Sequence, residues 1–374
     1  MFQSTRRVAV VSAMLAGSVF ASSGLAQGTT TVGGYGEVHY QNKSGPNTPG
    51  EINLARFVVF LSHAFNDRLA FRSELEVEDA KVAGGSSGGE VALEQAYVDY
   101  RLGSKATLRT GLVLVPVGII NETHEPPTFN GVARPSLEHD VIPATWRELG
   151  VGVTGALGSG LSYRLYLVNG LVAAGFSASE GLRDGRQEGR DATFANPSLT
   201  GRLEYARPGL KLGAAFFTGG TAGADTLVGT GWNDARVTVL AADARYDNGP
   251  LAVRGVLASV DLPDARAINR AYGHDVASRM TGGYVEAAYE LLSLGKYAGT
   301  ERLVGFARYE HYDTQASVPA GVTADPTNAR RNVTLGLTYL PIANVAFKGD
   351  VEFRHTSRGG PGVQVLSLGV GYWF

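Results

Sequence analysis

The amino-acid sequence predicts an all-β fold: a transmembrane antiparallel β-barrel of about 16 strands, with short periplasmic turns and long extracellular loops. Three observations lead to this prediction. Sixteen runs alternate apolar with polar residues, the connections between them are alternately short and long, and the last strand is apolar and ends in Phe374. A tilted spanning strand needs only about 9–11 residues, whose side chains face lipid and the barrel interior in turn.

The first 26 residues are predicted to be a secretory signal peptide. Arg6 and Arg7 form a basic start, Val8–Phe20 is apolar, and Gly24-Leu25-Ala26 supplies small residues for cleavage. This apolar run is too short to span a bilayer as a helix, which takes about 20 residues. Residues 27–374 are then expected to form one exported barrel domain, directed through the periplasm to the cell outer membrane.

Charge and cysteine content agree with such a barrel. The formal net charge is −2, and removing Arg6 and Arg7 makes the mature chain about −4, which gives no sign of nucleic-acid binding. The chain has no cysteine, whereas exported soluble domains often depend on disulfides.

The alternating runs have the period of two that the pleat of a strand imposes. In the last but one, Val345 and Phe347 lie on one face, and Lys348 and Asp350 lie on the other. A half-solvated sheet of a soluble protein alternates in the same way, but here sixteen strands would have to share one core without a helical segment to cover them. The runs are 30–41, 51–64, 68–79, 91–102, 106–115, 149–157, 160–169, 198–206, 209–218, 236–246, 250–260, 281–292, 302–312, 331–340, 344–355 and 362–374.

The connections differ in length in a regular order. Tight turns made of typical turn residues occur at Phe65-Asn66-Asp67, Gly103-Ser104-Lys105, Gly158-Ser159, Arg207-Pro208, Asp247-Asn248-Gly249 and Pro341-Ile342-Ala343. Between them stand long connections at 116–148, 170–197, 219–235, 261–280 and 313–330. Short turns on one side and long loops on the other are the arrangement of outer-membrane barrels.

Aromatic residues mark the membrane boundary. Seven of the eight strands that run toward the tight turns place an outward aromatic residue near that end: Phe65, Tyr100, Tyr205, Tyr246, Tyr289, Tyr339 and Tyr372. Such rings favour the interface between lipid and water. Because the chain closes on Tyr372 and Phe374, these two residues are predicted to act as the signal read by the barrel assembly machinery.

A barrel of this size encloses an aqueous lumen rather than a filled core. The lumen wall is predicted to carry charges of both signs, because these would meet water on that face. The residues are Arg68, Arg72, Glu74, Glu76, Arg109, Arg164, Arg202, Arg254, Lys348 and Arg354. For each one alone, a solvated wall without a specific ligand is the simpler interpretation; together they would set the ion preference.

Metal binding and catalysis find little support. His124-Glu125 and Glu138-His139-Asp140 offer nitrogen and oxygen donors, but their spacing matches no metal motif, so no metal and no cofactor are expected. None of the seven histidines belongs to a local nucleophile motif such as G-x-S-x-G. The sequence therefore predicts a protein that is not an enzyme.

Several stretches resemble the phosphate-selective porin O and P family. They are Leu93-Glu94-Gln95-Ala96-Tyr97-Val98-Asp99-Tyr100, Arg109-Thr110-Gly111-Leu112 with Val115-Pro116-Val117-Gly118, Gly283-Tyr284-Val285-Glu286-Ala287-Ala288-Tyr289, and Leu335-Gly336-Leu337-Thr338-Tyr339 with Pro341 and Lys348. The resemblance implies a trimeric sixteen-stranded barrel that passes small anions such as phosphate, or other small solutes.

The resemblance also gives a role to the third loop, 116–148, because this loop commonly folds into the barrel and narrows it in sixteen-stranded porins. Its polar residues would then line the constriction: Glu122, His124, Glu125, Arg134, Glu138, His139, Asp140 and Arg147. An external loop packed on its neighbours is the alternative. The loop departs from the family pattern, since it has five acids, two arginines and no lysine, which predicts a pore that is neutral to mildly cation-preferring.

The sequence thus predicts an outer-membrane porin for the passive diffusion of small hydrophilic solutes and ions. Its expected partners are the lipid bilayer, the assembly machinery and two further copies in a homotrimer, and nucleic acid is not among them. The alternative is a barrel with a closed lumen and an enzymatic or adhesive surface.

Overall fold

The computed structural model describes residues 28–45, 48–80, 89–295 and 299–374, so the predicted signal peptide lies outside the described residues. Strands make up most of this part of the chain. They are β1 (Thr29–Lys43), β2 (Glu51–Ala64), β3 (Leu69–Glu78), β4 (Val91–Arg101), β5 (Thr107–Leu114), β6 (Arg147–Gly158), β7 (Leu161–Val168), β8 (Ser198–Arg207), β9 (Leu210–Gly219), β10 (Val237–Asn248), β11 (Leu251–Asp261), β12 (Arg279–Glu290), β13 (Arg302–Ser317), β14 (Ala329–Ile342), β15 (Val345–Thr356) and β16 (Val363–Trp373).

The sheet closes on itself. Each strand pairs antiparallel with its neighbours in sequence, and β1 also pairs with β16, with Tyr35 opposite Trp373. At the end of this seam the backbone N–H of Phe374 donates to Gly34 O at 2.8 Å, and Gly34 N–H donates to Phe374 O at 3.0 Å. Closure leaves the sheet without an edge, as a strand-built span in lipid requires. The predicted closed antiparallel barrel of sixteen strands is confirmed.

The two faces of the strands differ as the period of two predicts. On β16, Leu366 and Leu368 are exposed on the outer surface, whereas Val365 and Ser367 are buried inside. Because apolar side chains cover the outside and charged ones the inside, the barrel has the reverse of a soluble protein's polarity.

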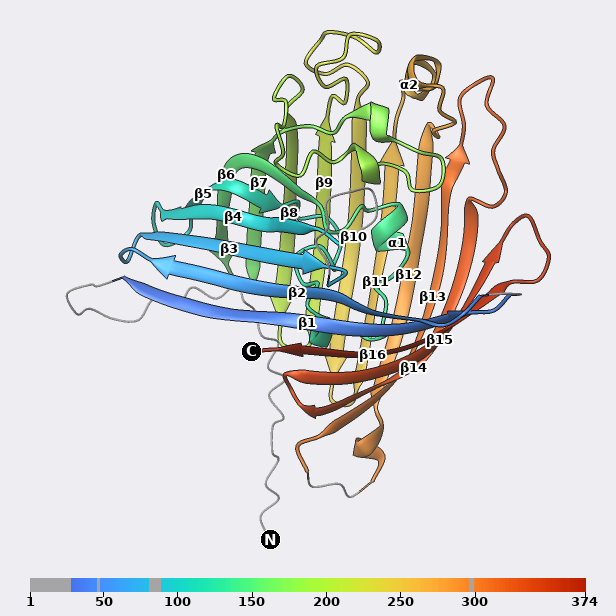
Figure 1. Ribbon diagram of the computed structural model, residues 1–374. Coiled ribbons are helices and arrows are strands. Elements are labelled where there is room, and N and C mark those ends of the chain that lie inside the picture. The colour runs from blue at the N-terminus through green and yellow to red at the C-terminus, as the bar shows by residue number, and fades with distance from the viewer. Residues whose placement is uncertain (1–27, 46–47, 81–88, 296–298) are drawn as a thin grey trace.

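Short helices occur in the connections. They are η1 (Pro126–Thr128) and α1 (Leu137–Asp140) in the third loop, η2 (Ala173–Gly175) and η3 (Arg183–Gly185) in the fourth, α2 (Ala265–Tyr272) between β11 and β12, and η4 (Leu291–Leu294) before β13. No helix of the described residues is long and apolar enough to cross a membrane. The helix α2 stands at the end of the barrel that carries long loops, whereas α1 lies inside the barrel (Figure 1).

Strand boundaries differ from the prediction at two functional positions. Arg147 and Glu148 were assigned to the third loop but belong to β6, where Arg147 pairs with Leu114 of β5. Arg68 was assigned to the lumen wall, but it is exposed in the turn before β3, and its carbonyl accepts from Arg101 N–H at 2.8 Å. Pairing with β5, which a single-strand pattern does not show, extends β6 back to Arg147. Arg68 stays in the turn because its backbone N–H donates to Asn66 Oδ1 at 2.8 Å.

An apolar core fills part of the interior. The third loop contributes Val117, Ile142 and Trp146, and the inner wall contributes Phe217 and Val239, all of them buried in one cluster. The apolar residues of the third loop thus find their packing partners on the inner wall.

Candidate functional site

The third loop crosses the barrel interior to the wall opposite its own strands. Its backbone N–H groups donate to wall carboxylates, from Leu137 to Glu310 of β13 at 3.0 Å and from Val132 to Asp350 of β15 at 2.6 Å. Because Glu310 and Asp350 are buried and have little access to water, these bonds also give their carboxylates the hydrogen-bond donors that they need. The loop is therefore part of the lumen and not an external excursion.

Lys348 holds the loop on the β15–β16 side. This predicted wall residue is buried, and its Nζ donates to Pro126 O at 2.6 Å and to Phe129 O at 2.8 Å. Gly371 of β16 makes the close approach possible, because a Cβ there would lie 2.3 Å from Pro126 Cβ. Lys348 thus fastens the third loop and does not face open water.

The two ends of the loop are tied together by Asn121. Its Nδ2 donates to Val115 O at 2.7 Å and to Trp146 O at 2.8 Å, and its Oδ1 accepts from Trp146 N–H at 2.6 Å. The Trp146 ring packs on Phe217 of β9 with 4.4 Å between ring centroids. This buried amide fixes the angle at which the loop enters the barrel, and sequence patterns did not single it out.

Three of the eight predicted constriction residues are buried and face away from open solvent: His124, Glu138 and Arg147. The Oε2 atom of Glu138 accepts from Ile119 N–H at 2.8 Å and from Ile120 N–H at 2.7 Å. Its Oε1 accepts from the hydroxyl of Tyr284 at 2.7 Å. Burial raises the pKa of Glu138, and these hydrogen bonds oppose that rise. Their burial departs from the predicted constriction because each side chain has a polar partner away from open solvent. Glu138 has its partners in the loop and on β12, His124 at two carboxylates of the wall, and Arg147 at Glu188 of the fourth loop.

The other five remain at least partly exposed. Glu122 forms an ion pair with Arg164 of β7 at 2.9 Å, and about a fifth of each side chain is exposed, 23% and 21%. Arg134 donates to His124 O at 3.3 Å, and Glu125 has no ion-pair partner within the described part of the chain.

His139 and Asp140 lie where the loop meets β13 and β14. His139 is exposed, and its Nδ1 is 2.7 Å from Asp140 Oδ1. Asp140 also accepts from the hydroxyl of Tyr312 at 2.8 Å and pairs with Arg330. Burial alone would raise the pKa of Asp140, but His139 and Arg330 outweigh it and hold this pKa below its usual value.

The charges of the wall are largely paired with one another. Arg202 of β8 binds both carboxylate oxygens of Asp243 of β10, at 2.6 and 2.8 Å. The pair spans the intervening β9 at Gly213, where a Cβ would lie only 2.1 Å from Arg202 Nη2. Arg254 pairs with Glu286 at 2.7 Å. Such pairing leaves little net charge on this part of the wall.

The remaining predicted wall residues follow the same pattern. Arg109 pairs with Asp99 at 2.8 Å and lies 3.8 Å from the centre of the Tyr97 ring. Arg354 pairs with Glu352 at 2.6 Å, and Arg72 is half-buried with a partner. Glu74 and Glu76 are buried beside β4. The predicted mixture of signs is present, and most of its arginines are paired with carboxylates.

The fourth loop, 169–197, also crosses the mouth of the barrel. Its Ala178 O accepts from the Thr314 hydroxyl of β13 at 2.6 Å, although the loop starts from β7. Arg186 donates to Thr145 O of the third loop at 3.0 Å, and Arg183 donates to Ala144 O. Burial, followed by the neighbouring charge of Arg186, lowers the pKa of Arg183 to about 10. The two loops therefore form one layer.

The sequence predicted this fourth loop only as a long connection. Its buried apolar residues Leu171, Phe176 and Leu182 pack in the same cluster as the third loop. Their apolar character within a polar segment was the signal that could have indicated inward packing.

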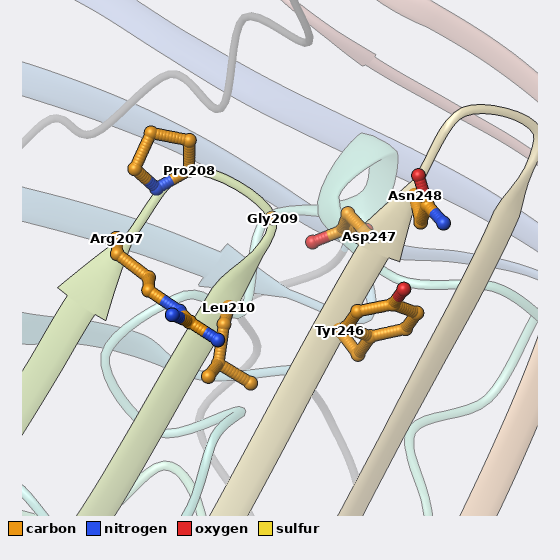
Figure 2. Close-up of a pocket in the computed structure, with 7 residues that line it drawn as sticks. All are labelled: Arg207, Pro208, Gly209, Leu210, Tyr246, Asp247 and Asn248. Atoms are coloured by element: carbon orange, nitrogen blue, oxygen red, sulfur yellow. The ribbon is translucent and has the colours of Figure 1, made fainter.

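The outer ends of the tight turns offer only a shallow hollow. Figure 2 shows Arg207, Pro208, Gly209 and Leu210 facing Tyr246, Asp247 and Asn248 at the ends of β8, β9 and β10. The backbone N–H of Asp247 donates to Gly209 O at 2.9 Å. The hollow is formed by turn residues at one end of the barrel. The candidate functional site is the interior, where the third loop meets the charged wall.

Comparison with known proteins gives a relative in sequence and several similar structures. No family model matches the chain. An uncharacterized protein of Aquifex aeolicus is 37% identical over 333 residues, which cover 86% of this chain and 74% of that protein.

Two solved porin-like structures show the same fold at low sequence identity. The anion-selective porin from Comamonas acidovorans is 12% identical with a TM-score of 0.61, over 93% of this chain and 100% of that one. The outer membrane channel DcaP of Acinetobacter baumannii is 13% identical with a TM-score of 0.59, over 93% and 97% of the two chains. At these identities the likeness concerns the fold.

Proposed function

We propose a channel function for this chain, which belongs to the same family as the uncharacterized Aquifex aeolicus protein. The proposal is an outer-membrane porin through which small hydrophilic solutes and ions diffuse passively. The observation that carries it is a third loop held inside a closed sixteen-strand barrel by a charged inner wall. An apolar outer surface and a polar interior support residence in the outer membrane, with residues 1–26 as the export signal.

We place the narrowest wetted region between the third loop and strands β5, β7 and β10. Inward charges there keep contact with water, with exposed side-chain fractions of 20% for Arg109, 21% for Arg164 and 20% for Arg245. On the opposite wall Lys348 and Asp350 are almost wholly buried against the third loop, and Arg308 is buried between two carboxylates of the wall. The solute path would therefore run to one side of the loop.

The proposed selectivity is weak. Glu122 and Asp140 are matched by Arg164 and Arg330, and Glu138 is buried, so few loop acids act on a passing ion unopposed. Neutral to mildly cation-preferring conduction without a tight phosphate site follows. A homotrimer is proposed because the family resemblance in the sequence implies one.

Purified barrel reconstituted in a planar bilayer should give stepwise, ohmic conductance. In a potassium chloride gradient the reversal potential should stay near zero, and millimolar phosphate should not block the current. The folded state is verified by the shift in gel mobility that heating causes in a barrel. If folded protein does not conduct, the result would favour a barrel whose lumen is closed, with the third and fourth loops as its plug. Strong anion selectivity with block by phosphate would contradict the weak-selectivity proposal.

Replacing Glu122 by Gln should move the preference toward anions, because it leaves the partly exposed Arg164 unpaired at the proposed constriction. The effect acts within a Debye length of about 8 Å at physiological salt and about 3 Å at 1 M, so high salt should erase it. Asp325→Asn removes the same charge from the exposed connection between β13 and β14 and serves as the matched control. Equal reversal potentials for the two variants would place the solute path elsewhere.

A further inference from the structure

His124 of the third loop points at two buried carboxylates of the barrel wall. Its Nε2 lies 3.0 Å from Glu94 Oε2 of β4 and 3.3 Å from Glu74 Oε1 of β3. One donor atom from each of the three side chains lies within 4.8 Å of the others, and all three residues are buried. They come from three elements, since β3 and β4 are neighbouring strands and His124 lies in the loop that passes over them.

Each of the three side chains is oriented by a further hydrogen bond. His124 Nδ1 lies 3.1 Å from Asn121 O, and in the tautomer that donates this bond Nε2 is free to coordinate. Gln95 Nε2 donates to Glu74 Oε2 at 2.6 Å, and the Tyr35 hydroxyl donates to Glu94 Oε2 at 3.4 Å. A histidine held by a carbonyl and carboxylates held by outer donors are the surroundings that metal ligands usually have.

The cluster is short of positive charge. Glu94 is wholly buried, yet its Oε1 has no hydrogen-bond partner within the described part of the chain. The carboxyl of Glu94 lies against those of both Glu74 and Glu76. The nearby cation Arg56 divides its contacts between Glu76 at 3.3 Å and Glu37 at 2.6 Å. Buried charges of one sign call for a counter-charge. Beyond the shared guanidinium of Arg56, it can come from a proton on His124 or from a bound cation in its place.

We propose that Glu74, Glu94 and His124 bind a divalent first-row transition-metal cation that fastens the third loop to β3 and β4. Imidazole with carboxylates suits Zn²⁺ and its neighbours, whereas Ca²⁺ and Mg²⁺ favour oxygen alone. Tetrahedral Zn²⁺ with ligand distances of about 2.0–2.1 Å places its ligand atoms about 3.3 Å from one another. The 3.0 and 3.3 Å separations around His124 Nε2 are close to this value.

This site would act on the loop and not on the solute. His124 is the point at which the third loop meets the β3–β4 wall, and Asn121, which ties the loop ends together, is its neighbour in the same turn. A bound cation would therefore cross-link the loop to the barrel. The proposal extends beyond the channel function, because a metal can be bound whether or not the pore conducts.

Metal content is the direct test. Untagged protein is refolded into detergent after treatment with a chelator, in Zn²⁺ with excess Mg²⁺ and Ca²⁺, and is then separated from free ions by gel filtration. We expect one Zn²⁺ per chain, and with Co²⁺ in its place a visible spectrum of low-symmetry coordination. Folded protein that emerges without Zn²⁺ would overturn the proposal and leave His124 as an ion-pair partner of the two acids.

Variants locate the ion. Glu94→Gln and His124→Gln should each weaken Zn²⁺ binding at least about tenfold, the range that loss of supporting contacts alone produces in metal sites. His139→Gln, which removes an exposed histidine of the same loop, should bind as the parent chain does. Heat modifiability on gels verifies that each variant is folded. Undiminished binding by Glu94→Gln would contradict the assignment even if His124→Gln did not fold.

Discussion

Replacing Glu138 by Ala should loosen the third loop and raise the single-channel conductance, with larger current noise. The carboxylate is the common acceptor for Ile119 N–H, Ile120 N–H and the Tyr284 hydroxyl, all of them buried. Each buried donor left without a partner costs about 1–3 kcal/mol of stability, and the substitution leaves three buried donors without their acceptor at once. The measurement is conductance in planar bilayers, together with protease cleavage within the third loop.

Glu125→Ala is the matched control for this change. It removes the same functional group from the same loop, but Glu125 is partly exposed and without an ion pair among the described residues. Its conductance should change less than that of Glu138→Ala, and its current noise should stay that of the parent chain, because no buried donor loses its acceptor. If Glu138→Ala conducts with the same amplitude and noise as Glu125→Ala, the loop does not depend on the buried carboxylate.

Deleting Phe374 should sharply reduce the amount of folded barrel in the outer membrane. The residue closes the seam, because its backbone N–H and C=O both bond to Gly34 of β1. Its ring packs on Phe57 with 6.4 Å between centroids and stands on the outer surface, 62% exposed. Deletion removes the last paired position between β16 and β1 and the aromatic end that we propose the assembly machinery reads. The heat-modifiable fraction in isolated outer membranes measures the effect.

Phe65→Ala controls for the loss of an outward aromatic ring. Phe65 is 47% exposed but lies in the β2–β3 turn, away from the seam. The folded fraction of this variant should remain near that of the parent chain. Equal levels for the deletion variant and the parent would show that neither closure nor recognition needs Phe374, while a loss shared by both variants would point to the aromatic girdle in general.

The sequence alone determined the barrel, because each strand is specified by the alternation of its own residues and by the turn residues next to it. Alternation in a run such as 344–355 follows from the pleat, and turn residues such as Asp247-Asn248-Gly249 mark the hairpin between β10 and β11. Antiparallel pairing of neighbours along the chain then needs no long-range information, apart from the one closure between β1 and β16. The same local pattern assigned charged side chains to the interior.

Only the tertiary structure decided what those charges do. Lys348 reaches Pro126 across 222 positions of sequence, and Glu138 reaches Tyr284 across 146. His124 meets Glu94 and Glu74 from loop to wall, across 30 and 50 positions. A period of two says which face a residue occupies but not which distant residue comes opposite to it. That partner depends on barrel closure and on the path of the third loop, which burial of its apolar residues and pairing of its polar ones settle together.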